Sequence, residues 1–140
     1  MLDKERILAK LEELHSYLDE LKAVAPRSYA EYEGSVEKRR ACERLLHISI
    51  ECVIDVCHLI VSGLRLGLPA GEEDLFGKLE QSGVISRGLA DTLRRMGAFR
   101  DILVHRYGRV DDRLVYDVVT RGSGDFDDFK NAVLEVVGSR

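Results

Sequence analysis

Proline is scarce in this chain of 140 residues, which contains only Pro26 and Pro69. Because proline interrupts helices more effectively than any other residue, its scarcity leaves long stretches free to be helical. No apolar run reaches the ~20 residues that a membrane span requires. The first ten residues, MLDKERILAK, include charged residues that begin at the third position. We therefore expect a few long helices, and we expect neither secretion nor membrane insertion.

An excess of positive charge is missing as well. The formal net charge is -4, whereas a dedicated DNA-binding domain usually has a strongly basic surface. Any contact with a nucleic acid would therefore have to be local.

The sequence also lacks several signatures of disulfide and phosphate chemistry. Cys42, Cys52 and Cys57 form neither a CxxC pair nor the spacing of a disulfide framework, so we expect them to be core residues of a cytosolic protein. There is no GxxxxGK(S/T) loop and no GxGxxG after a strand. Ser49 and Ser62 lack the context of a nucleophile elbow.

The composition of the chain is typical of one folded domain. It is 45% hydrophobic and 33% charged, and its length is close to the most common domain size. We therefore expect residues 1–140 to form a single domain. Apolar residues recur every three or four positions over most of the chain, which indicates amphipathic helices. The sequence thus predicts an all-α fold, an antiparallel bundle of four to five main helices.

The same pattern predicts where the helices begin and end. A first helix spans about residues 3–24 and is ended by Pro26, and a longer second helix spans about residues 28–66. The run 114–119 is rich in β-branched residues, but it suits a helix about as well as a strand. Four further helix starts are expected: near Glu72, at Ser86 for a helix that reaches His105 or Tyr107, at Asp111, and at Asp125 as a cap of the last helix.

One charged residue, Arg100, falls in the middle of an apolar helix face. A bare guanidinium there is costly unless it pairs with a carboxylate or lines a cleft. Two interpretations are open: a structural salt bridge across the bundle, or a contact with phosphate, whose oxygens match the planar fork of arginine. The apolar face around Arg100 consists of Leu89, Leu93, Met96, Leu103 and Val104.

His105 follows Arg100 by five residues, which on a continuous helix turns its side chain by roughly 140° from the arginine. A histidine can both take and give a proton near neutral pH, but one unbroken helix cannot aim both groups at one point. Either the helix frays before Gly108, or the two groups come from two copies of the chain. Tyr107 returns to the Arg100 face if the helix lasts that far, so these three residues are candidates for one small pocket.

A narrow polar line follows the second helix. Glu51 and Asp55, one turn apart on that line, are candidate partners for Arg100 and for orienting His105. The plainer interpretation is the solvent face of an amphipathic helix. A metal site is disfavoured, because such spacings arise easily on a polar face and no HExxH arrangement occurs. The line consists of Arg44, His47, Glu51, Asp55 and His58.

These residues resemble a known family. The segment RDILVHRY, residues 100–107, matches the Rx4HxY motif of HepT-like proteins in the HEPN superfamily, and the flanking MGAF and GRVDD are also similar to that family. The segment ERLLHISIECVIDV, residues 43–56, resembles the family's second helix, and QSGVIS, residues 81–86, resembles its lead into the motif helix. The resemblance spans nearly the whole chain in the expected order.

The resemblance implies a cytoplasmic toxin of a toxin-antitoxin pair that acts as a homodimer and cuts RNA without a metal or other cofactor. Arg100 and His105 would be catalytic, and Asp101, at a position where the family more often has asparagine, would support them together with Glu51 and Asp55. The family's antitoxin is a minimal nucleotidyltransferase that can attach AMP to the motif tyrosine, here Tyr107. A bulky anionic group at that residue would repel RNA phosphates.

These expectations combine into one mechanism and leave two rivals. In the mechanism, His105 deprotonates a ribose 2′-OH and Arg100 stabilises the charge on the attacked phosphate, which yields a 2′,3′-cyclic phosphate. In the first rival, the chain is a non-catalytic module that binds a nucleotide at Arg100 and serves as partner of a nucleotidyltransferase. In the second, it is a purely structural helical dimer in which Arg100 pairs with Glu51 or Asp55.

Overall fold

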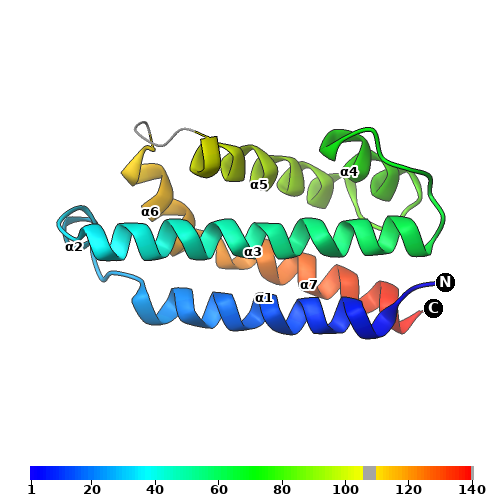
Figure 1. Cartoon of the computed structure of the whole chain (residues 1–140), viewed down its shortest axis with the longest axis horizontal. Coiled ribbons are helices and arrows are strands. Elements are labelled where there is room, and N and C mark those ends of the chain that lie inside the picture. Colours follow the sequence, from blue (N-terminus) through cyan, green and yellow to red (C-terminus); the bar gives the residue numbers. More distant parts are fainter. Residues whose placement is uncertain (106–109, 140) are drawn as a thin grey trace.

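The computed structural model of the protein describes residues 1–105 and 110–139, and over these residues it contains helices and no strand (Figure 1). The all-α prediction is thus confirmed for this part of the chain. The helices are α1 (Lys4–Val24), α2 (Tyr29–Glu33), α3 (Val36–Gly63), α4 (Glu72–Gln81), α5 (Arg87–His105), α6 (Asp112–Arg121) and α7 (Ser123–Gly138).

Four long helices form the bundle, with α3 at its centre. Figure 1 shows α1 beside α3 and running in the opposite direction, α5 on the other side of α3, and α7 behind. Contacts join α3 to both α1 and α5, and α7 to the same two helices. The short helices lie at the ends, α4 near the start of α5, and α2 together with α6 at the opposite end (Figure 1). This arrangement is the antiparallel bundle that the hydrophobic periodicity predicts.

The central position of α3 in the core explains its unusually apolar sequence. Eleven of its residues are buried, because neighbouring helices pack on several of its sides. By length and composition alone α3 is apolar enough to cross a membrane, yet 56% of its most apolar window is buried inside the bundle, as in the central helix of a folded domain. Cys42, Cys52 and Cys57 are buried and free, which confirms them as core residues.

Several predicted helix starts are confirmed by their caps. The side chain of Asp3 accepts a hydrogen bond from Arg6 N at 3.2 Å, and Ser86 accepts one from Leu89 N at 3.1 Å. Asp111 caps α6 in the same way. Each of these side chains satisfies an amide that the first turn of a helix leaves without a partner.

Two predicted boundaries are wrong. The expected helix over residues 28–66 is split, because the chain turns at Gly34 and Ser35 then caps α3 by accepting a hydrogen bond from Lys38 N at 3.2 Å. The last helix begins at Ser123, so Asp125 lies inside its first turn instead of capping it. An acidic residue in that turn is still favourable, since it faces the positive end of the helix dipole.

Candidate functional site

Arg100 lies on α5 and reaches toward α3 and α4. Its side chain is 12% exposed, because the α5 face that carries it also carries buried apolar residues such as Leu93 and Met96. Ion pairs with carboxylates offset the free-energy cost of burying this guanidinium, as the sequence pattern predicts.

Three carboxylates surround the guanidinium of Arg100. Nη1 donates to Glu51 Oε1 at 2.6 Å, Nη2 donates to Glu72 Oε2, and Nε donates to Asp101 Oδ1 at 3.0 Å. One cation therefore faces three anions contributed by α3, α4 and α5. Burial by itself lowers the pKa of Arg100, but the hydrogen bonds that the guanidinium donates to Glu72, Glu51 and Asp101 outweigh it and raise that pKa, so the arginine stays charged.

Sequence reasoning missed Glu72, which stands at the first position of α4. It reaches Arg100 because Gly97, one turn before the arginine on α5, has no side chain: a Cβ on Gly97 would lie 2.8 Å from Glu72 Oε1. A glycine in the interior of a helix lowers its stability and often marks a close approach of another group. Gly97 was thus the available signal, although it does not say which group approaches.

His47 on α3 extends the cluster beyond Glu51. Its Nε2 lies 3.7 Å from Glu51 Oε1, the same oxygen that accepts from Arg100, and its Nδ1 lies 3.2 Å from Arg44 Nη1. Burial lowers the pKa of His47, the nearby guanidinium groups of Arg44 and Arg100 lower it further, and Glu51 raises it, with a net decrease. The imidazole is therefore mostly neutral at pH 7.

The other sequence-predicted residue of the second helix takes a different partner. Asp55 forms an ion pair with Lys10 of α1, with Oδ2 and Nζ 3.3 Å apart. Four residues advance a helix by about 40° beyond a full turn, which turns Asp55 from the α5 side of α3 toward α1. Its supporting role in a cleft remains a prediction.

His105 is the last residue of α5 and is exposed. Since the helix is unbroken from Arg87 to His105, the rotation of roughly 140° between Arg100 and His105 holds within this chain. The structure therefore does not bring these two groups together in one copy. Tyr107 lies outside the described residues.

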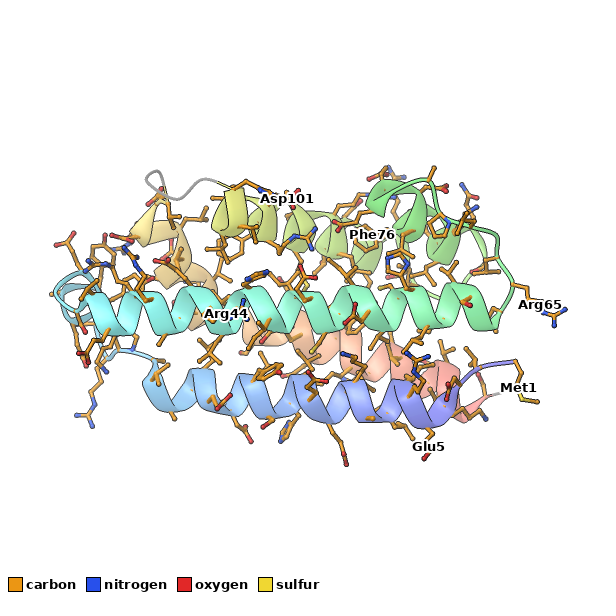
Figure 2. All side chains as sticks on the ribbon, in the orientation of Figure 1. Met1, Glu5, Arg44, Arg65, Phe76 and Asp101 are labelled. Carbon is orange, nitrogen blue, oxygen red and sulfur yellow. The ribbon has the colours of Figure 1, made fainter. Side chains whose placement is uncertain are left out.

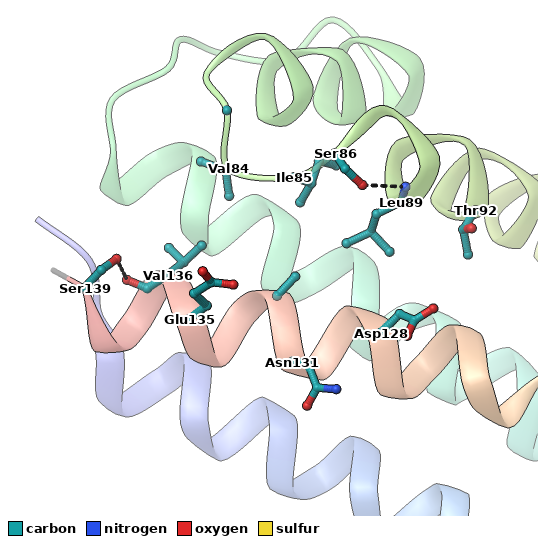
Figure 3. Close-up of a pocket in the computed structure, with 12 residues that line it drawn as sticks. Val84, Ile85, Ser86, Leu89, Thr92, Asp128, Asn131, Glu135, Val136 and Ser139 are labelled. Carbon is teal, nitrogen blue, oxygen red and sulfur yellow. Dashed lines mark hydrogen bonds between the residues drawn. The ribbon is translucent and has the colours of Figure 1, made fainter.

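Two hollows on the described part of the surface lie apart from this cluster. One of about 560 Å³ lies between the start of α5 and α7, where Ser86, Leu89 and Thr92 face Asp128 and Glu135 (Figure 3). An apolar hollow of about 370 Å³ borders α5, α6 and α7. Within residues 1–105 and 110–139, no three His, Cys, Asp or Glu side chains are grouped so that they could hold a metal ion.

Comparison with known proteins places this arrangement in context. A family model described as Ribonuclease HepT-like matches residues 8–133. The mRNA nuclease HepT of Shewanella oneidensis is 32% identical over 83 residues, which are 59% of this chain and 62% of that protein. The tRNA nuclease HepT of Aphanizomenon flos-aquae is 29% identical over 114 residues, 81% of this chain and 78% of that protein. The match thus spans less than two thirds of the Shewanella relative.

Solved structures share the fold. A tri-AMPylated Shewanella oneidensis HEPN toxin in complex with MNT antitoxin superposes with a TM-score of 0.86 at 24% identity, over 96% of this chain and 99% of that one. The cytosolic protein YutE of Bacillus subtilis superposes with a TM-score of 0.83 at 20% identity, over 99% and 92% respectively. At these identities the likeness supports the helical fold.

Proposed function

Because this chain belongs to the HepT-like ribonuclease family, we propose that it is a metal-independent endoribonuclease, the toxin of a cytoplasmic toxin-antitoxin pair. The observation that carries the proposal is the placement of the motif RDILVHRY inside the matched region. Its arginine is charged and held by three helices, and its histidine is exposed at the end of α5. Relatives that match much of this chain are an mRNA nuclease and a tRNA nuclease.

The proposed reaction is an internal transfer at an RNA phosphodiester. His105 takes the proton of a ribose 2′-OH, the 2′ oxygen attacks the adjacent phosphorus, and the bond from phosphorus to the 5′ oxygen breaks. A second imidazole gives its proton to the leaving 5′ oxygen, so the products are a 2′,3′-cyclic phosphate and a 5′-OH end. Arg100 stabilises the negative charge that builds on the phosphate oxygens.

The geometry of α5 supports a cleft shared by two copies of the chain. With an unbroken helix through His105, Arg100 and His105 of one copy point in different directions. Asp101 and Glu51 hold the arginine, and in this proposal they orient it toward a phosphate that the His105 of a second copy also reaches. The second imidazole is then the His105 of the first copy, so that each copy contributes one histidine to the cleft.

Mixing two inactive variants tests the shared cleft. Arg100→Ala and His105→Ala are each expected to lose RNA cleavage, whereas a refolded equal mixture recovers part of the wild-type activity. A mixed dimer retains one arginine and one of the two histidines of the cleft, and water then protonates the leaving 5′ oxygen less effectively than the missing imidazole. The reaction is run with a chelator, and the cyclic phosphate is identified by mass spectrometry. No recovery in the mixture, a requirement for a divalent metal, or full activity of His105→Ala would contradict the proposal.

We further propose that a minimal nucleotidyltransferase is the antitoxin and that it attaches AMP to Tyr107. The superposed HEPN toxin, which is tri-AMPylated and bound to an MNT antitoxin, suggests this partner. Co-expression with such a partner should raise the intact mass of the chain in steps of one AMP. Tyr107→Phe should prevent the mass increase, and an unchanged mass of the wild-type chain would count against this regulation.

One rival function is favoured by a specific observation. The ion pairs of Arg100 with Glu51 and Glu72 are what a purely structural salt bridge would look like. Growth separates the alternatives: expression of the chain alone should arrest cells under the toxin proposal, and Arg100→Ala should relieve the arrest. A structural protein, or a non-catalytic nucleotide-binding partner of a nucleotidyltransferase, predicts neither effect.

A further inference from the structure

Arg44 differs from the other cationic residues of α3 in its surroundings. Lys38 pairs with Glu31, Arg39 with Asp112 and Arg40 with Glu43. Among the residues that the structure describes, Arg44 has no carboxylate within 4.0 Å, and its side chain contacts an imidazole instead. Arg44 is exposed and has no acidic partner, although acidic residues cluster nearby. Its guanidinium is therefore free to bind an anion.

His47 contacts one nitrogen of the Arg44 guanidinium. Since arginine can only donate, the contact of 3.2 Å from Arg44 Nη1 requires a lone pair on His47 Nδ1. The imidazole proton then lies on Nε2, which faces Glu51 Oε1 at 3.7 Å. The lowered pKa of His47 agrees with this neutral form. Arg44 keeps its Nε and Nη2 donors, which suffice for a bidentate contact with phosphate.

The Arg44–His47 pair is coupled directly to the Arg100 cluster. Glu51 Oε1 contacts both His47 and Arg100, so one carboxylate oxygen joins the two groups. Figure 2 shows Arg44 on α3 and Asp101, the residue that follows Arg100, on the neighbouring helix α5. An extended polyanion that crosses from α5 to α3 would meet Arg100 and Arg44 in turn.

We propose that Arg44 and His47 form a second phosphate-binding subsite, which takes a phosphodiester of single-stranded RNA next to the one at Arg100. Arg44 binds the phosphate oxygens, and His47 is a positioning residue that presents the guanidinium. The subsite rests on the proposed function for its ligand, and it explains how an acidic protein binds RNA locally. It adds a second cationic contact next to Arg100, where three carboxylates offset part of the positive charge of the arginine.

Salt-dependent binding tests the subsite without relying on cleavage. The His105→Ala protein is titrated against a fluorescein-labelled single-stranded RNA of about twelve nucleotides, and anisotropy gives the affinity between about 50 and 200 mM KCl. Adding Arg44→Gln should weaken binding about three- to tenfold at the lowest salt. It should also reduce the slope of log affinity against log salt by about 0.7, the value for one lost contact with a single strand.

Two matched comparisons make the result specific. Arg40→Gln removes the same charge one turn earlier on α3, but Arg40 is paired with Glu43, so the slope should not change. His47→Asn keeps an acceptor near the position of Nδ1 and should retain more affinity than His47→Ala. Thermal melts establish that each variant is folded.

The outcomes separate the subsite from the nuclease proposal. If Arg44→Gln changes affinity and slope no more than Arg40→Gln does, the subsite is refuted even where the wild-type chain cleaves RNA. If the slope falls as expected but the wild-type chain never cleaves RNA, the subsite stands and the nuclease proposal fails. If the His105→Ala protein binds no RNA at any salt concentration, the subsite is refuted together with its RNA ligand.

Discussion

At the scale of single residues, the surroundings of Arg100 decide how its replacement should act. The guanidinium is mostly buried, while Glu51 and Glu72 are 42% and 35% exposed. Losing the arginine leaves these carboxylates without their cation, but water screens them in part. Arg100 therefore has both a structural role in the bundle and a proposed chemical role, and the two are separable by experiment.

Arg100→Gln should lower the free energy of unfolding by on the order of 2 kcal/mol, less than for a fully buried pair because the carboxylates remain partly hydrated. Urea unfolding measures the loss. The triple variant Arg100→Gln, Glu51→Gln, Glu72→Gln should recover part of it, since neutral amides do not repel one another. If the triple variant is less stable than Arg100→Gln, the ion pairs are not the source of the effect.

The lowered pKa of His47 predicts how the stability of the protein depends on pH. Its pKa in the fold is below the ordinary value, so the unfolded chain binds a proton first as the pH falls, and stability decreases. The His47 contribution is complete above an ordinary pKa of about 6.5 and is lost below it. The drop in melting temperature between about pH 7.5 and 5.5 should be smaller in His47→Asn than in the wild type. Equal drops would mean that His47 is not shifted.

At the scale of helices, α4 can approach α5 closely because Gly97 on α5 has no side chain. Glu72 occupies the space that a Cβ on Gly97 would take, while the nearest other atom, Phe76 Cε2, would lie at an ordinary 3.8 Å. The cost of a helical glycine is thus offset by the approach of the carboxylate to Arg100.

A double-mutant cycle tests this relation. In a Glu72→Ala background, Gly97→Ala should stabilise the protein by up to about 1 kcal/mol, because alanine favours the helix. In the wild type the gain should be smaller, since the new Cβ displaces Glu72 from Arg100. Urea unfolding of the four proteins gives the coupling energy. An identical gain in both backgrounds would show that Glu72 and Gly97 do not interact.

The elements also show why local patterns misplace some boundaries. The periodicity of residues 28–66 continues across Gly34, so the pattern alone predicts one helix. The chain turns there, and Tyr32 on the short α2 is fully buried and packs near Tyr116 of α6. The break thus combines the local cap at Ser35 with a contact between segments far apart in the sequence, and periodicity contains neither.

At the scale of the whole molecule, residues 8–133 lie within one family match and one bundle. The expectation that the chain folds as a single domain remains a prediction. Shortening the side chain of Phe129 tests this expectation. Phe129 lies on α7, is 1% exposed and belongs to the shared core.

Phe129→Ala should cost about 3–5 kcal/mol, because it leaves a cavity in the core. A single domain unfolds in one transition. The unfolding midpoints from helical circular dichroism and from tyrosine fluorescence should therefore shift together. Two separate transitions, or a shift seen by one probe alone, would contradict a single domain.

By itself, the sequence determined the helical class, most helix starts, the buried cysteines and the need of Arg100 for an acidic partner. These follow from periodicity, capping and the cost of a buried charge, which act over a few neighbouring residues. The tertiary structure alone decided that Glu72 joins Glu51 at Arg100, that Asp55 turns to Lys10, and that Arg44 is left with His47. Those pairings depend on the distances between packed helices, which no local pattern along the chain encodes.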